Sequence, residues 1–264
     1  MPYVDVDGAR VSYRVDGQGP GLVLVHGTGG SAETSWTEVI DRLASRWTVV
    51  RPDYAGSGDT VDGGGPLSLD VLAAQVVAAA EDAGVAPFHV LGFSLGALVA
   101  VKIAADYAER VCSVVPLGGF VSSADPRIQL QFRLWRDLIE RDREAMVRLG
   151  LLTCFSAAYL GRFDAATLEQ AVAADLANND WEGLARQVEL DLALDVSVEA
   201  ARIERPALVI GCSDDQIAPP WHARNLAALI PGAVYAELES GHCATFEVPE
   251  DLLDLVEPFL LRAG

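Results

Sequence analysis

The sequence predicts an α/β fold with a mostly parallel, doubly wound sheet and an inserted helical cap. Three observations lead to this prediction. Short apolar runs alternate with longer helical stretches, which is typical of parallel βαβ units. The run "GLVLVHG" at 21–27 is continuously apolar and ends in glycine, as expected for a strand buried on both faces. Between 120 and 204 this alternation stops, and only helical patterns follow.

Seven strands are expected from these runs, and helices are expected between them. The first, at 10–15, is expected to be antiparallel to its neighbours, and the others are expected at 21–27, 47–53, 88–93, 111–119, 206–212 and 233–238. The clearest helical patterns lie at 67–84, 96–110 and 248–264. The last opens with Pro249 followed by acidic residues, which is a common helix start.

The strand-free segment at 120–204 is expected to form a cap over the carboxyl edge of the sheet. It is rich in Ala, Leu, Arg, Asp and Glu, and strand signals resume only at "PALVIGC". The predicted domains are therefore a core made of 1–119 and 205–264, and a helical cap at 120–204. No repeat, low-complexity tract or interdomain linker interrupts them.

Composition limits the classes of function. The chain is 51% hydrophobic and 22% charged, which suits a globular enzyme. Its net charge of −19 disfavours nucleic acid and anionic membranes as partners. The N-terminus lacks a signal-peptide pattern and no apolar run reaches membrane-spanning length, so a cytoplasmic protein is expected. The four scattered cysteines lack C-x-x-C spacing, and neither a metal site nor a disulfide framework is expected.

Ser94 is the candidate nucleophile. It lies in "LGFSLG", which matches G-x-S-x-G, between a short apolar strand and a helix of small residues. At such a strand-to-helix turn the serine hydroxyl is aimed out of the carboxyl edge of the sheet. A side chain at Gly92 or Gly96 would collide with neighbouring backbone, and the helix N-terminus favours an oxyanion nearby.

A serine hydroxyl needs a base, and His242 is the best placed of four histidines. It lies in the loop "ESGHCATFE" after the last predicted strand. The alternatives are interpreted structurally: His89 as a strand residue, His222 as a surface residue near a helix start, and His26 as a brace for its loop.

The acid and the oxyanion hole complete the candidate site. Asp214 and Asp215 both follow the strand "ALVIG", and either carboxylate can orient the imidazole. The backbone amides of Leu95 and Thr28 are the candidate oxyanion donors, because they follow the nucleophile and lie in the "HGTGG" loop respectively. The chain order of serine, aspartate and histidine separates this arrangement from the chymotrypsin and subtilisin types.

Taken together, the chain resembles the α/β-hydrolase fold superfamily over nearly its whole length. "RPDYAGSGDT" is similar to the family's D-x-x-G-x-G loop, and "LESGHCATFEVPEDLLDLVEPFL" is similar to its usual ending. The resemblance implies an eight-stranded sheet, a cap after the sixth strand and no cofactor. It favours Asp215 as the acid through "DQIAP", with Asp214 as the alternative. Serine at position 94 argues against epoxide hydrolases and haloalkane dehalogenases, which carry aspartate there.

The predicted cap supplies aromatic side chains for a substrate pocket: Phe132, Trp135, Phe155 and Tyr159. A small to medium, largely apolar ester or thioester is therefore the expected substrate. The segment 127–148 holds six of the 19 basic residues and could dock coenzyme A or a carrier protein. A solvated helix is favoured instead, because Arg133–Asp137, Asp137–Arg141 and Glu144–Arg148 have the i, i+4 spacing of ion pairs.

The leading functional prediction is a serine esterase or thioesterase that acts on a small molecule through an acyl-enzyme. Two alternatives stay open: a lyase or cyclase that uses His242 as acid and base, and a ligand receptor with little turnover. The composition suggests a GC-rich bacterial source, where natural-product tailoring enzymes of secondary metabolism occur. A monomer and a homodimer are both compatible with the sequence.

Overall fold

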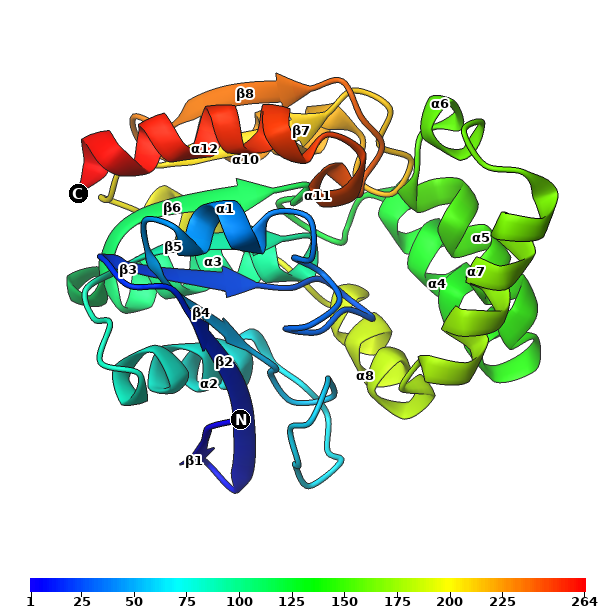
Figure 1. Ribbon diagram of the computed structural model, residues 1–264, viewed down its shortest axis with the longest axis horizontal. Coiled ribbons are helices and arrows are strands. Elements are labelled where there is room, and N and C mark those ends of the chain that lie inside the picture. Colours follow the sequence, from blue (N-terminus) through cyan, green and yellow to red (C-terminus); the bar gives the residue numbers. More distant parts are fainter.

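The computed structural model describes residues 1–264 and has an eight-stranded sheet at its centre (Figure 1). The strand order is β1-β2-β4-β3-β5-β6-β7-β8. Strands β1, β2 and β4 pair antiparallel, and the remaining pairs are parallel, so the predicted mostly parallel sheet is confirmed. The strands are β1 (Tyr3–Val6), β2 (Ala9–Asp16), β3 (Gly21–Val25), β4 (Thr48–Pro52), β5 (Phe88–Phe93), β6 (Val111–Leu117), β7 (Leu208–Cys212) and β8 (Val234–Leu238).

The strand that the sequence patterns missed is β1. Its four residues, "YVDV", are exposed or half-buried at the edge of the sheet. A short edge strand buries little apolar surface, so it gives no continuous apolar run to recognise.

Helices cover both faces of the sheet, as a doubly wound fold requires. In β3, Leu22 and Leu24 pack into one cluster with α1 and α12, whereas Val23 and Val25 pack into the other with α2, α3 and α10. This two-sided burial explains why β3 is apolar at every position. The covering helices are α1 (Ile40–Ala44), α2 (Leu69–Asp82), α3 (Leu95–Asp106), α10 (Pro220–Leu229) and α12 (Pro249–Ala263); the 3₁₀ turn η1 (Ala108–Arg110) follows α3, and α11 (Ala244–Glu247) precedes α12.

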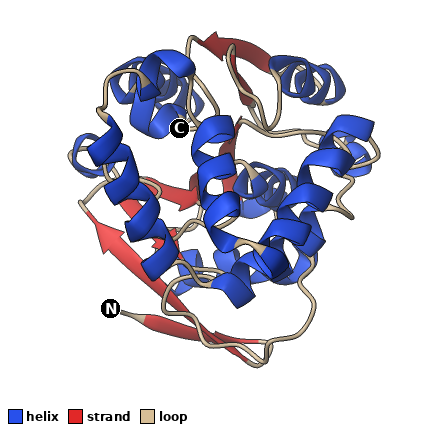
Figure 2. Cartoon of the chain, turned by 90° about the vertical axis from the view of Figure 1, so that its right-hand side faces the viewer, coloured by secondary structure: helices blue, strands red, loops and turns tan.

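Six helices lie between β6 and β7, and the first five of them form a layer beside the carboxyl ends of the strands (Figures 1 and 2). Four of them begin at an aspartate whose side chain caps the first turn, which explains the sharp starts of these polar helices. The last of the six packs against α3 and α10 of the core. They are α4 (Pro126–Arg141), α5 (Arg143–Cys154), α6 (Ala157–Leu160), α7 (Ala165–Asn178), α8 (Trp181–Asp191) and α9 (Ser197–Ala201).

The basic stretch of α4 and α5 forms only one of the three expected i, i+4 ion pairs. Arg148 binds Glu144 at 2.8 Å and also binds Glu169 of α7 at 2.8 Å. The expected pairs of Asp137 with Arg133 and Arg141 do not form, and the Asp137 carboxylate pairs instead with neighbouring Arg136, at 3.8 Å. No helix of the chain is long and apolar enough to cross a membrane.

Candidate active site

Ser94 occupies a strained turn between β5 and α3. Its backbone has φ 57° and ψ −120°, a conformation that non-glycine residues rarely adopt. The two flanking glycines make this turn possible. A Cβ at Gly92 would lie 2.0 Å from the Gly96 carbonyl oxygen, and a Cβ at Gly96 would lie 2.0 Å from that of Val25. The sequence argument for both glycines is therefore confirmed by the packing.

His242 and Asp215 meet at the same edge of the sheet. Asp215 follows β7 and His242 follows β8, and the His242 Nδ1 lies 2.6 Å from Asp215 Oδ2. The other carboxylate oxygen of Asp215 accepts hydrogen bonds from the backbone amides of Ile217 and Ala218, both at 2.8 Å. Because Nδ1 is engaged with Asp215, the neutral ring keeps Nε2 free to accept a proton.

The imidazole of His242 packs against the residue before Ser94. Its ring centroid lies 4.9 Å from that of Phe93, and a Cβ on Gly118 would lie 3.2 Å from His242 Cε1. Burial lowers the pKa of His242, but the charge of Asp215 and its hydrogen bond outweigh burial and raise the pKa above its ordinary value. Asp214 is exposed and forms no hydrogen bond with the imidazole. Of the two candidate acids, Asp215 is therefore the one that pairs with His242.

The other three histidines are also buried, and each contacts residues other than Asp215. His26 Nδ1 lies 2.9 Å from the Gly27 carbonyl oxygen, and its ring stacks on Tyr54. His89 bonds Ser113 between two strands. The expected surface position of His222 is wrong: the residue is 5% exposed, and its ring lies edge-on to that of Phe120 with centroids 6.4 Å apart. Burial lowers the pKa of His222.

The "HGTGG" loop after β3 approaches Ser94 closely. A Cβ at Gly27 would lie 2.8 Å from the Ser94 Cβ, which explains the need for glycine at this position. The backbone N–H of Thr28 donates to no acceptor within the protein. The N–H of Leu95 lies in the first turn of α3, where helical amides have no partner inside the helix. Both amides are thus available to an outside acceptor.

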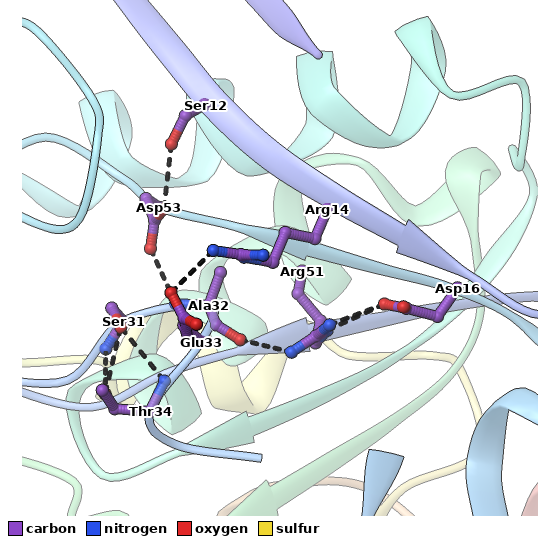
Figure 3. A network of polar contacts seen from close by, with 9 residues as sticks. All are labelled: Ser12, Arg14, Asp16, Ser31, Ala32, Glu33, Thr34, Arg51 and Asp53. Carbon is purple, nitrogen blue, oxygen red and sulfur yellow. Dashed lines mark hydrogen bonds and ion pairs between the residues drawn. The ribbon is translucent and has the colours of Figure 1, made fainter. Parts of the chain in front are cut away.

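A buried polar network holds this loop against β4 and β2 (Figure 3). Asp53 accepts hydrogen bonds from the Ala32 amide at 2.6 Å and from the Ser12 hydroxyl at 2.9 Å. Arg51 donates to the Ala32 carbonyl at 2.6 Å and pairs with Asp16 at 2.7 Å. Both backbone groups of Ala32 are therefore fixed by charged side chains, which makes the loop rigid.

Helix α8 holds the same loop from the opposite side, through two residues that the sequence analysis missed. Gln187 accepts a hydrogen bond from the Gly29 amide at 2.7 Å and donates to the Gly56 carbonyl at 2.8 Å. Asp191 accepts one from the Thr28 hydroxyl at 2.6 Å. The available signal was their i, i+4 spacing beside Leu184 and Val188, which puts two polar residues on the buried face of the helix.

A cavity of about 250 Å³ opens between this loop and the inserted helices. Of the four aromatic residues expected to bind substrate, Trp135 and Phe155 line it. Phe132 and Tyr159 do not: Phe132 turns inward against Phe120, and Tyr159 stacks on Phe155 instead. The apolar part of the lining consists of Phe93, Trp135, Met146, Val147, Leu151, Cys154, Phe155, Leu184, Cys243 and Phe246.

A second, more polar cavity of about 290 Å³ adjoins the first. The two share Gly29, Gly30, Thr34, Asp175, Asn179 and Leu184. Glycines of the loops after β3 and β4 form one wall, and the end of α7 forms the other. An apolar cavity and a polar one therefore border the loop that approaches Ser94; their linings include Thr28 and Phe93 but not Ser94 or His242.

Comparisons with known proteins identify the family to which the chain belongs. The family model described as "alpha/beta hydrolase fold" matches residues 20–249. The chain is 52% identical to pyrrolizixenacetamide deacetylase of Xenorhabdus hominickii over 99% of its own length and 98% of that protein. It is 30% identical to a protein assigned as carbamate hydrolase RutD in Azorhizobium caulinodans, with 96% of each chain covered.

Solved structures show the same architecture. The enol-lactonase of Burkholderia xenovorans LB400 superposes with a TM-score of 0.88 at 27% identity, covering 98% of this chain and 100% of that one. The matched family model spans most of the chain, and the similar proteins carry the names of hydrolases. The chain therefore belongs to the α/β-hydrolase fold family and is a hydrolase.

Proposed function

We propose that the chain removes a small acyl group from an amide through an acyl-enzyme on Ser94. The observation that carries this proposal is the strained turn at Ser94 together with the buried His242–Asp215 pair, whose imidazole packs against Phe93, the residue before Ser94. The relative with 52% identity is named a deacetylase of an acetamide, which favours an N-acyl substrate over the ester or thioester expected from the sequence alone. A cavity of about 250 Å³ suits a small acyl group joined to a compact apolar amine.

The proposed reaction has two halves, acylation of Ser94 and hydrolysis of the acyl-enzyme. Ser94 Oγ attacks the carbonyl carbon while His242 Nε2 takes the hydroxyl proton, and Asp215 stabilises the imidazolium. The amides of Thr28 and Leu95 bind the oxyanion. Collapse breaks the C–N bond, and His242 returns its proton to the leaving amine. A water activated by His242 then releases the acid and restores Ser94.

Further proposals follow from the same arrangement. The inserted helices at 120–204 act as a cap that supplies the cavity wall, with Trp135 and Phe155 as substrate-contacting residues. The residues present require no metal or organic cofactor for this chemistry, and the partner is a small molecule.

The test is turnover of 4-nitrophenyl acetate and 4-nitroacetanilide by the wild type, Ser94→Ala and His242→Ala. A serine acyl hydrolase loses at least about 10³-fold in kcat in both variants. A lyase or cyclase would lose its native reaction in His242→Ala but retain it in Ser94→Ala. A receptor would show no turnover in the wild type, and either result would contradict the proposal.

A further inference from the structure

The backbone around His242 is anchored on both sides of the histidine. Before it, the backbone N–H of Gly241 donates to Oε1 of Glu247, the last residue of α11, at 3.2 Å. After it, the backbone N–H of Cys243 donates to the carbonyl oxygen of Cys154, the last residue of α5, at 2.9 Å. The proposed general base therefore lies between two anchors, and the second of them belongs to the inserted helices.

Glu247 connects the first anchor to the inserted helices as well. Its Oε1 also accepts a hydrogen bond from the backbone N–H of Ser156 at 2.8 Å, and its Oε2 accepts one from the Ser156 hydroxyl at 2.6 Å. Ser156 is the N-cap of α6, where its hydroxyl accepts a hydrogen bond from the Tyr159 backbone N–H at 3.1 Å. One carboxylate thus joins Gly241 to the junction between α5 and α6.

This junction is closely packed and withdrawn from solvent. Glu247 is 8% exposed and Ser156 is 7% exposed. A Cβ at Gly241 would lie 2.5 Å from both Glu247 Oε1 and the Ser156 backbone nitrogen, so glycine is needed for the close approach. The hydrogen bonds that Glu247 accepts offset the cost of removing its charge from water. Without its carboxylate, two buried backbone N–H groups would lose their acceptor.

The same junction forms part of the wall of the apolar cavity. Cys154 and Phe155 line the cavity from the inserted helices, and Cys243 and Phe246 line it from the segment after β8. The rings of Phe155 and Phe246 meet edge to face, with their centroids 6.3 Å apart. This part of the cavity wall and the backbone beside His242 therefore form one packed unit.

We propose that Glu247 is a positioning residue for His242, because it fixes the loop of the general base to the inserted helices and so sets the imidazole relative to Ser94. This inference rests on the proposed acyl-enzyme reaction and gives the inserted helices a role beyond that of cavity wall. Glu247 does not line the cavity, so it acts through the backbone of Gly241. Proton transfer needs hydrogen-bond reach, and a displacement of about 1 Å can cost about 100-fold in rate.

Three substitutions of Glu247 test the inference with 4-nitrophenyl acetate. Glu247→Ala is expected to lower kcat/KM by about 100-fold. Glu247→Asp keeps the charge but is too short to reach both Gly241 and Ser156, so we expect a loss of about tenfold. Glu247→Gln keeps the length and an oxygen that accepts both backbone N–H groups, so activity should stay within about threefold of the wild type. Asp251→Asn, which changes an exposed carboxylate on α12, is the matched control and should have no effect.

Labelling by a fluorophosphonate probe separates positioning from folding. If Glu247 positions His242, Glu247→Ala and Glu247→Asp still reach one adduct per chain on Ser94, but about 100-fold and about tenfold more slowly than the wild type. Should Glu247→Ala fail to fold, Glu247→Asp carries the test. Folded chains that label at the wild-type rate would overturn the inference, because Glu247 would then only stabilise the fold. A larger loss in Glu247→Gln than in Glu247→Asp would also overturn it, because charge and not reach would matter.

Failure of the proposed function has a different signature. Labelling or turnover that persists in Ser94→Ala, or a wild type that neither labels nor turns over, would overturn the acyl-enzyme reaction itself. Activity that depends on Ser94 and His242 but is unchanged in Glu247→Ala and Glu247→Asp would overturn only the positioning role. Thermal melting of each variant shows whether it is folded at the assay temperature.

Discussion

The Nδ1 of His242 lies 2.6 Å from Oδ2 of Asp215, and both side chains are almost wholly withdrawn from solvent, at 4% and 0% exposure. The imidazole has one ring nitrogen engaged with a carboxylate that two backbone amides also hold. This pairing orients Nε2 and stabilises the cation that forms when the ring takes a proton.

Asp215→Asn should lower kcat for 4-nitrophenyl acetate by about 10³- to 10⁴-fold. An amide at this position can donate to Nδ1, which places the imidazole proton on Nε2, where it blocks acceptance of the serine proton. Steady-state kinetics on the purified variant provides the measurement.

Asp214→Asn is the matched control for that variant. Asp214 is exposed and lies outside the pair, so kcat should stay within about twofold of the wild type. Equal losses in the two variants would refute the assignment of Asp215.

Gly96→Ala should destabilise the chain by about 3 kcal/mol or prevent folding, because the new Cβ would lie 2.0 Å from the backbone oxygen of Val25. Gly63→Ala, where nothing lies within 4 Å of the added methyl group, should change the free energy of unfolding by less than about 0.5 kcal/mol. Urea unfolding of both variants checks this difference, and a stable Gly96→Ala protein would show that the close approach of α3 to β3 is not required.

Gln187→Met should lower kcat/KM for esters and amides alike, by about tenfold to 100-fold. The substitution leaves the Gly29 amide unpaired, and a lost buried hydrogen bond is worth about 1–3 kcal/mol. Glu189→Gln, an exposed change on the same helix, should have no effect on activity. Normal kinetics in Gln187→Met would mean that α8 does not set the geometry of the loop.

Asp191→Asn should gain stability relative to the wild type as the pH rises from about 4 to about 7. In that interval the folded wild type keeps a proton on Asp191, whose pKa is about 7, whereas the unfolded chain has released it. Folding therefore binds a proton, so wild-type stability falls with rising pH, and asparagine removes this dependence.

Melting temperatures of both proteins at about pH 5 and about pH 8 measure the effect. The difference between variant and wild type should move by several degrees in favour of the variant at the higher pH. A difference that is the same at both pH values would show that Asp191 has an ordinary pKa in the folded protein.

Local patterns in the sequence were sufficient to predict most of the sheet and the Ser94 turn. Continuous apolar runs indicated the strands that are buried on both faces, such as β3. The sequence also predicted that a side chain at Gly92 or Gly96 would collide with neighbouring backbone, and the structure confirms this. The edge strand β1 was missed because it buries too little apolar surface to leave such a run.

Contacts between distant segments could not be predicted in the same way. Gln187 and Asp191 reach the loop after β3 from a helix about 160 residues later, and only the packing of α8 brings them there. The burial of His222 and the inward turn of Phe132 likewise depend on how Phe120 packs after β6. Local sequence shows that these residues lie in helices but does not show which face meets the core.

The most direct test of the central claim is labelling by a fluorophosphonate probe, followed by intact-protein mass spectrometry and peptide mapping. The account predicts one adduct per chain, located on Ser94. Labelling should be absent in Ser94→Ala, strongly slowed in Asp215→Asn and unaffected in Asp214→Asn. A wild type that takes up no label, or an adduct on another residue, would contradict an activated serine at position 94.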